Sequence, residues 1–262
     1  MSDSFSAFTQ LVLAVALCMP RILAAFTVVP FLRQGYVTGV TRNCIAVSFS
    51  LILFPIIFPV VREKNISALV FLAIIAKESV IGAALGYMVG LLFWGIQAVG
   101  KIIDYQRGAH VAEAYDPSFG GEMSPIGNLL MPLFIMIFFS SGGFIVFLSA
   151  IYESFQAWPI FSYLPVPSSK VAIFSLNKID DFMEMVLLLT APLIILMFIS
   201  DIGMGIINRF APQLNILFLS MPIKSVLGIL LLILYLPYFL FYLKNYIVQN
   251  ANVLNILKIV MK

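Results

Sequence analysis

Six long apolar runs occupy most of this 262-residue chain and constrain its fold more than any other feature. They cover about Phe8–Val29, Cys44–Val61, Ser67–Val99, Leu129–Tyr152, Phe182–Ser200 and Leu214–Leu243. In hydrocarbon, a helix satisfies every backbone polar group within its own segment. Most runs also contain proline, which removes an intrahelical hydrogen bond and bends the helix. The runs therefore predict an all-α, polytopic membrane-type protein of about six kinked hydrophobic helices.

The charged fraction of the chain supports this class. Charged residues make up 10% of the sequence and hydrophobic residues 62%, whereas soluble domains carry about 25% charged residues. The net charge of +3 and the absence of a basic run give no indication of a nucleic-acid partner. Membrane lipid is the expected surrounding. Lysine and arginine are balanced between the two sets of loops, so they do not orient the spans.

The third apolar run contains a stripe of residues at strict four-residue spacing. Glu78, Gly82, Gly86 and Gly90 lie on one helix face, and their two overlapping GxxxG patterns predict close packing against a neighbouring helix. Lys77 precedes Glu78. Ionisable groups in such surroundings are usually paired or functional. An interhelical ion pair is the favoured interpretation, with a proton relay as the alternative.

Segment 101–128 concentrates charge between two apolar runs. Its ionisable residues are Lys101, Asp104, Arg107, His110, Glu113, Asp116 and Glu122. Hydrocarbon does not hold such a segment, so it must face water or lie in protein along a cavity. An exposed connector is the plainer alternative.

Segment 201–225 is a second polar stretch, which contains glycine and proline, lies between the apolar stretches 182–200 and 226–243, and overlaps the start of the last apolar run. It predicts the turn of a hairpin whose tip presents hydrogen-bonding groups, or an interfacial loop without a partner. A Pro/Ser connector at Tyr163–Ser169 predicts a division into a front four-helix part, 1–162, and a C-terminal helical hairpin, 163–262.

Little in the sequence indicates catalysis. His110 is the only histidine, and no glycine-rich phosphate loop is present. We therefore expect neither enzymatic activity nor a cofactor or metal. A secondary transporter with a midplane site built from broken helices is the alternative function. Within helices, the sequence offers such a site Lys77, Glu78 and little more.

Two sets of motifs carry a resemblance to a known family. The first comprises Asn208–Asn215 and Leu219–Ser225, and the second Tyr105–Gly108, Tyr115–Gly121 and Met123–Leu130. These blocks resemble the T-type export-gate subunits of bacterial type III secretion, which are related to the R-type subunit of the flagellar export gate. The resemblance extends from about residue 5 to residue 245.

The resemblance implies a multi-pass protein of the bacterial inner membrane that helps form and close a pore for unfolded substrate proteins. Its implied partners are other export-gate subunits, with one copy of this chain beside several copies of each, and the exported proteins in transit. The implied plug-loop residues are Tyr105, Gln106, Arg107, Gly108, Tyr115, Asp116, Pro117, Phe119, Gly120, Gly121, Ser124 and Pro125. The implied partner-binding tip comprises Asp201, Asn208, Arg209, Pro212, Gln213, Asn215, Pro222 and Lys224.

Overall fold

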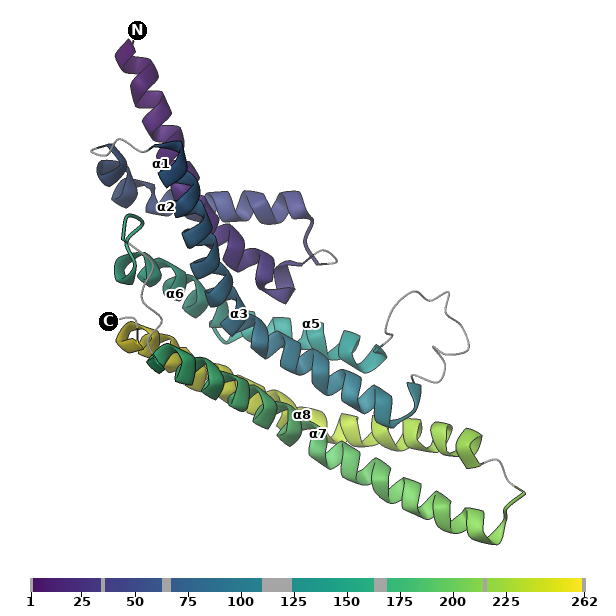
Figure 1. Cartoon of the computed structure of the whole chain (residues 1–262). Coiled ribbons are helices and arrows are strands. Elements are labelled where there is room, and N and C mark those ends of the chain that lie inside the picture. The colour runs from purple at the N-terminus through teal and green to yellow at the C-terminus, as the bar shows by residue number, and fades with distance from the viewer. Residues whose placement is uncertain are drawn as a thin grey trace. The chain divides into compact units, whose positions relative to one another are not determined.

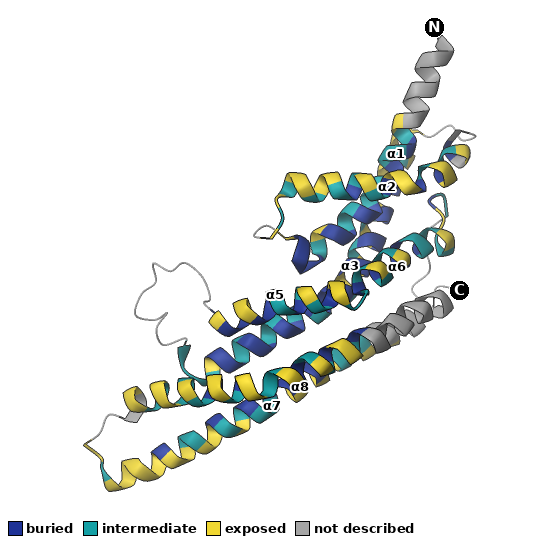
Figure 2. Cartoon of the chain, turned by 180° about the vertical axis from the view of Figure 1, so that it is seen from behind, coloured by how far each residue is buried: buried dark blue, intermediate teal, exposed yellow. Residues whose placement is uncertain are grey.

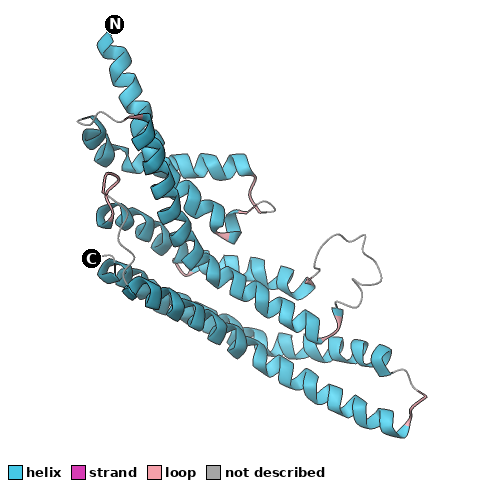
Figure 3. Ribbon diagram, in the orientation of Figure 1, coloured by secondary structure: helices cyan, strands magenta, loops and turns pink. Residues whose placement is uncertain are grey.

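Helices are the only regular elements in the part of the chain that the computed structural model describes (Figures 1 and 3). The described backbone comprises residues 2–33, 36–62, 67–109, 124–162, 169–213 and 216–260. Its elements are α1 (Ser2–Val28), the 3₁₀ helix η1 (Pro30–Leu32), α2 (Gly39–Arg62), α3 (Ala68–Gln106), α5 (Pro125–Ser140), α6 (Gly143–Ala157), α7 (Ser169–Phe210) and α8 (Ile216–Val260). The predicted all-α, polytopic fold is confirmed.

Four of these helices are long and apolar enough to cross a membrane. They are Gly39–Pro59, Ala68–Gln106, Leu176–Phe210 and Phe218–Ile247, and the broken pair α5 and α6 would make a fifth span if it crosses as one. The 45 residues of α8 extend roughly 68 Å at 1.5 Å per residue, against a hydrocarbon core of about 30 Å. The longest helices therefore reach beyond the hydrocarbon at one end or both.

The fourth apolar run differs from its prediction as a single segment. The structure divides it into α5 and α6, with a break at Ser141 and Gly142. The Gly142 φ angle is +77°, a left-handed conformation that glycine adopts without the steric cost of a Cβ. This glycine, and not the internal Pro132, is therefore where the helical run stops.

Both polar segments contain more helix than predicted. Segment 201–225 was expected to be a turn, but α7 continues to Phe210 and α8 starts at Ile216. Pro212 explains the end of α7, because the residue before a proline is pushed out of the helical region. Likewise, α3 extends to Gln106 and α5 begins at Pro125, so segment 101–128 is helical at both ends.

The chain forms two compact units. Unit 1 contains residues 1–93, 142–175 and 250–262, and unit 2 contains residues 94–141 and 176–249. Both units contain residues before and after the predicted connector Tyr163–Ser169, of which 163–168 lie outside the described residues. The division into 1–162 and 163–262 stays a prediction.

The core of unit 1 is built where α1 packs on α2, and it is rich in phenylalanine. Phe26 is fully buried and packs against Phe49 and Phe147, with both ring centroids 6.1 Å away. Phe31 of η1 lies 5.1 Å from Phe93 by the same measure. These rings bring α1, η1, α2, α3 and α6 together around one apolar centre.

In unit 2, α7 and α8 lie side by side (Figure 1). A Cβ at Gly228 of α8 would overlap the side chain of Met197, which shows how closely the hairpin packs. In Figure 2, the ribbons of both helices carry many residues coloured as exposed, and many of the exposed residues are large and apolar. They include Leu187, Ile195, Phe198, Ile229, Leu230, Ile233 and Phe241. An apolar surface of this extent requires lipid or partner helices around it.

Candidate functional site

A buried charge cluster joins α1 to α3 in unit 1. Arg21 of α1 and Glu78 of α3 are both fully buried, and Arg21 Nη2 lies 2.6 Å from Glu78 Oε2. Arg21 Nε donates to the same oxygen at 2.6 Å. Lys77 Nζ lies 3.0 Å from Glu78 Oε1, and the Lys77 side chain is 7% exposed. One carboxylate thus faces two cations.

Arg21 also contacts the C-terminal end of α6. Arg21 Nη1 donates to Ser154 Oγ and Arg21 Nη2 to the Trp158 carbonyl, each at 2.9 Å. The guanidinium carbon also lies 3.9 Å from the centroid of the Phe155 ring. Arg21 therefore binds α6 through hydrogen bonds and a cation–π contact, in addition to its ion pair with Glu78.

Lys77 binds the backbone that follows α6. Its ammonium donates to three carbonyl oxygens, those of Pro159 at 3.2 Å, Ile160 at 2.5 Å and Ser162 at 3.1 Å. Carbonyls beyond a helix C-terminus lack intrahelical donors and carry partial negative charge. The ammonium uses all three of its donors on them, which leaves Lys77 without a donor for a transported ligand.

The glycine stripe of α3 faces α1 of the same chain. A Cβ at Gly82 would overlap the Arg21 carbonyl, and a Cβ at Gly86 would lie 2.5 Å from the carbonyl oxygen of Ala25. Gly90 is also buried. The backbone of α1 therefore occupies the groove along Gly82 and Gly86, and this close approach places Arg21 beside Glu78.

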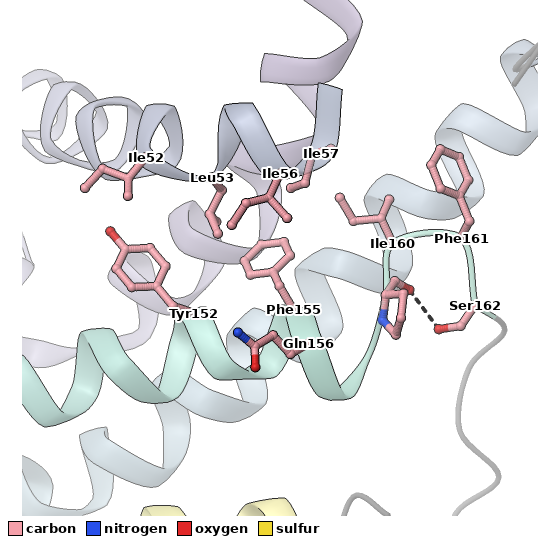
Figure 4. Close-up of a pocket in the computed structure, with 11 residues that line it drawn as sticks. Ile52, Leu53, Ile56, Ile57, Tyr152, Phe155, Gln156, Ile160, Phe161 and Ser162 are labelled. Carbon is pink, nitrogen blue, oxygen red and sulfur yellow. Dashed lines mark hydrogen bonds between the residues drawn. The ribbon is translucent and has the colours of Figure 1, made fainter. Parts of the chain in front are cut away.

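A pocket of about 650 Å³ lies in unit 1 between α2 and the end of α6. Figure 4 shows Ile52 and Ile56 on one side of it, with Phe155 and Gln156 opposite. None of its lining residues is charged. The pocket therefore suits an apolar group and offers nothing to balance the charge of an ionic substrate.

In unit 2, Asp104 joins the end of α3 to the beginning of α5. The Asp104 side chain is almost fully buried, and its Oδ2 accepts from Ser124 Oγ at 2.7 Å and from the Ile126 backbone N–H at 3.0 Å. Ser124 Oγ in turn accepts from the Gly127 N–H at 3.0 Å, as a helix N-cap. Arg107 Nη2 pairs with Asp104 Oδ1 at 2.7 Å. Asp104 therefore adds a carboxylate to the positive end of the α5 dipole.

The backbones of α3 and α5 also meet directly beside this carboxylate. A Cβ at Gly100 would overlap the backbone of Gly127. We call the contacts among Gly100, Asp104, Ser124, Ile126 and Gly127 the neck. The neck holds together the two ends of segment 110–123.

The hairpin brings together some of the predicted tip residues. Lys224 Nζ lies 2.5 Å from Asp201 Oδ1, which joins α8 to α7. Asn208 and Arg209 lie exposed in the last turn of α7 and are not part of this pair. Pro212 and Gln213 are exposed in the turn, and Pro222 is exposed within α8. The remaining tip residue, Asn215, lies outside the described residues.

The predicted plug residues are only partly described. Tyr105, Gln106, Arg107 and Gly108 lie at the end of α3, and Ser124 and Pro125 lie at the start of α5. Tyr115, Asp116, Pro117, Phe119, Gly120 and Gly121 lie outside the described residues. Within the described ranges, no group of three or more His, Cys, Asp or Glu residues could hold a metal ion.

Sequence reasoning missed the role of Arg21 and the side-chain contacts of Asp104. Arg21 is a lone cation in an apolar run, which is itself a signal that a buried partner exists. Its partner Glu78 lies 57 positions away, so the pairing required the fold. Ser124 followed by Pro125 is a recognisable helix start, whereas nothing in the sequence indicates that the Asp104 carboxylate reaches it.

The sequence of this chain is similar to those of known bacterial export proteins. The family model for bacterial export proteins, family 1, matches residues 12–249. Yop proteins translocation protein T of Yersinia pestis is 36% identical over 226 residues, which cover 85% of each chain. Secretion system apparatus protein SsaT of Salmonella typhimurium is 29% identical over 251 residues, 91% of each chain. Flagellar biosynthetic protein FliR of Bacillus subtilis is 26% identical over 224 residues, 84% of this chain and 85% of FliR.

These matches extend over nearly all of the described helices, and they include both injectisome and flagellar proteins. The chain therefore belongs to family 1 of the bacterial export proteins, as a T-type subunit of the type III secretion export apparatus and a multi-pass protein of the inner membrane.

Proposed function

We propose that this chain helps form and close the pore through which unfolded proteins leave the cytoplasm, and that segment 101–128 closes it. The observation that carries the proposal is the neck. Asp104 is 3% exposed and binds Ser124 and Ile126 across the two ends of the segment. A polar insertion fastened at both ends to apolar helices suits a plug that stays in place at rest.

Two further features support the assignment. The sequence of the segment includes the large side chains of Tyr115 and Phe119 and the adjacent residues Gly120 and Gly121, and glycine is the residue type with the widest choice of backbone conformation. The charges in and beside it tolerate water, which a protein-conducting pore contains. A pore wide enough for an extended polypeptide would leak small solutes unless a segment of this kind filled it.

The apolar surface of α7 and α8 supports heteromeric assembly. A transporter that works alone would need a polar site within its helices, but Arg21, Lys77 and Glu78 bind one another and the end of α6. We therefore favour an export-gate subunit, surrounded by sister subunits and lipid, over a secondary transporter.

Replacement of residues 108–121 tests the proposal. One variant carries a short Gly-Ser linker, and a second carries a Gly-Ser segment of the original length. Both keep Asp104 and Ser124, so the neck stays intact. Cells that contain the assembled apparatus with either variant should take up small solutes that wild-type cells exclude.

The control replaces Asn43, an exposed residue of α2 outside both the segment and the predicted tip, with serine. This control should leave permeability unchanged. Co-purification with the sister subunits must first show that each variant assembles. An impermeable membrane around an assembled variant would place the seal elsewhere and contradict the proposal.

A further inference from the structure

The side chain of Lys224 joins three helices of unit 2. Its ammonium pairs with Asp201 of α7 at 2.5 Å and donates to the Gln106 carbonyl at the end of α3, 3.4 Å away. The Lys224 side chain is only 15% exposed. Gln106 is the last residue of α3, where carbonyls lack intrahelical donors. A cation there also complements the negative end of the α3 dipole.

A second contact connects the same two elements. Gly108 has a φ angle of +87°, and a Cβ at this position would lie 3.2 Å from Met221 Cγ. Met221 and Lys224 are three residues apart and therefore share one face of α8. That face covers the residues that end α3, through an apolar contact at Gly108 and a polar contact at Gln106.

The last turn of α3 is therefore held from two directions. Asp104 binds it to the start of α5, and Lys224 binds it to the α7–α8 hairpin. We propose that Lys224 is a positioning residue that couples the position of the hairpin to the position of the end of α3. The importance of this coupling for the pore rests on the function proposed above, because segment 110–123 follows this turn directly. The coupling itself does not depend on that function.

The contacts of Lys224 with Asp201 and with the Gln106 carbonyl, which we call the Lys224 bridge, can break as well as form. Ion pairs with access to solvent contribute only about 0–1 kcal/mol, and Asp201 is 37% exposed. A component that displaces the hairpin can therefore break the Lys224 bridge at small cost in free energy. The end of α3 then loses one of its two attachments while the Asp104 attachment remains.

Hydrogen exchange in the assembled apparatus tests the coupling. The amides of Arg107 and Gly108 bond to the carbonyls of Ile103 and Tyr105, so a peptide over the end of α3 reports on this turn. Loss of up to about 1 kcal/mol corresponds to a factor of about five, so Lys224→Met should accelerate exchange there by up to about fivefold. Lys224→Arg keeps a cation that can reach both acceptors and should restore most of the protection.

Lys178→Met is the matched control. Lys178 pairs with Asp181 at 2.6 Å on α7, with side chains 17% and 42% exposed, close to the values for Lys224 and Asp201. This ion pair lies within α7, so its loss should leave exchange at the end of α3 unchanged. Equal acceleration by Lys178→Met would overturn the coupling.

A charge swap separates the two contacts of Lys224. Asp201→Lys combined with Lys224→Asp can restore the ion pair within the hairpin, but an aspartate cannot donate to the Gln106 carbonyl. The end of α3 should therefore exchange quickly in the swapped protein although the hairpin is stable. Wild-type exchange in the swapped protein, or in an assembled Lys224→Met variant, would refute the coupling.

Solute uptake by the same cells distinguishes the two proposals. Faster exchange at the end of α3 together with leakage supports both the coupling and the plug. Faster exchange without leakage supports the coupling and counts against the plug.

Discussion

Cationic side chains close the C-terminal ends of two helices, one in each unit, but their surroundings differ. In unit 1, Arg21 and Lys77 bind the end of α6 around Glu78, which is fully buried. In unit 2, Lys224 binds the end of α3 beside Asp201, which is 37% exposed. The first cluster excludes water, whereas water can replace a lost partner in the second.

This difference in solvent access leads to different energetics. Removal of one member of a buried ion pair leaves an uncompensated charge and costs about 3–5 kcal/mol, whereas a solvent-accessible pair contributes about 0–1 kcal/mol. The cluster in unit 1 therefore fixes the packing of α1, α3 and α6. The bridge in unit 2 can open without unfolding the unit. Similar ion pairs thus stabilise the helix packing of unit 1 and allow the hairpin of unit 2 to move relative to the end of α3.

The largest effect is expected from Glu78→Gln. The amide leaves Arg21 and Lys77 buried without a counter-charge, so the variant should lose about 3–5 kcal/mol of stability. Membrane insertion should persist, but the yield of assembled complex should fall sharply. Thermal aggregation of the detergent-solubilised protein measures the loss.

Asp201→Asn is the corresponding control in unit 2, because it also neutralises a carboxylate that faces lysine. Its stability should change by less than about 1 kcal/mol. Similar losses in the two variants would mean that burial does not distinguish the clusters, and the comparison would fail.

A smaller effect is expected where α3 approaches α1. A Cβ at Gly86 would lie 2.5 Å from the carbonyl oxygen of Ala25. Gly86→Ala should therefore force the helices apart and cost about 1–3 kcal/mol, the usual range for overpacking. Gly86→Leu should go further and prevent assembly with the sister subunits while insertion persists.

Gly203→Ala provides the control for this prediction. Nothing lies within 4 Å of a Cβ at Gly203, which is inside α7. Alanine there should stabilise the helix by about 1 kcal/mol through its higher helix propensity. Assembly of the Gly86→Leu variant at wild-type yield would show that the α1–α3 contact is unimportant.

The sequence predicts the elements of this molecule better than their side-chain partners. The four-residue spacing of Gly82 and Gly86 predicts a close helix approach, because small residues leave a groove whatever the neighbour is. It does not identify that neighbour as α1. Ion pairs such as Arg21 with Glu78 are long-range, so no local pattern encodes them.

The extent of α7 and α8 was underestimated for a related reason. Gly203, Gly205 and Pro222 predict a turn by local propensity alone. Propensity is a weak prior, however, and pairing between two long helices overrides it. Only Pro212 coincides with the end of a helix. The sequence therefore contains the signal that ends α7, but it does not distinguish Pro212 from the glycines and the proline that lie within the helices. Tertiary packing makes that distinction.

The smallest effect on stability is expected from Arg209→Ala, at the exposed end of the hairpin. Arg209 lies in the last turn of α7 and is exposed, so its loss should change stability by less than about 0.5 kcal/mol. The guanidinium nevertheless presents a rigid fork of donors that suits carboxylates and carbonyls of another export component. Secretion should therefore fall while the core complex assembles at wild-type yield.

Arg209→Lys sharpens this test, because it keeps the charge and loses the fork. If geometry matters, the lysine variant should secrete almost as poorly as the alanine variant. If charge alone matters, it should secrete normally. Unchanged secretion by the Arg209→Ala variant would show that Arg209 is not needed to bind another export component. Loss of the core complex would show that Arg209 is needed for assembly. Either result would contradict the contrast between a cluster that holds unit 1 together and a hairpin end in unit 2 that is free to engage a partner.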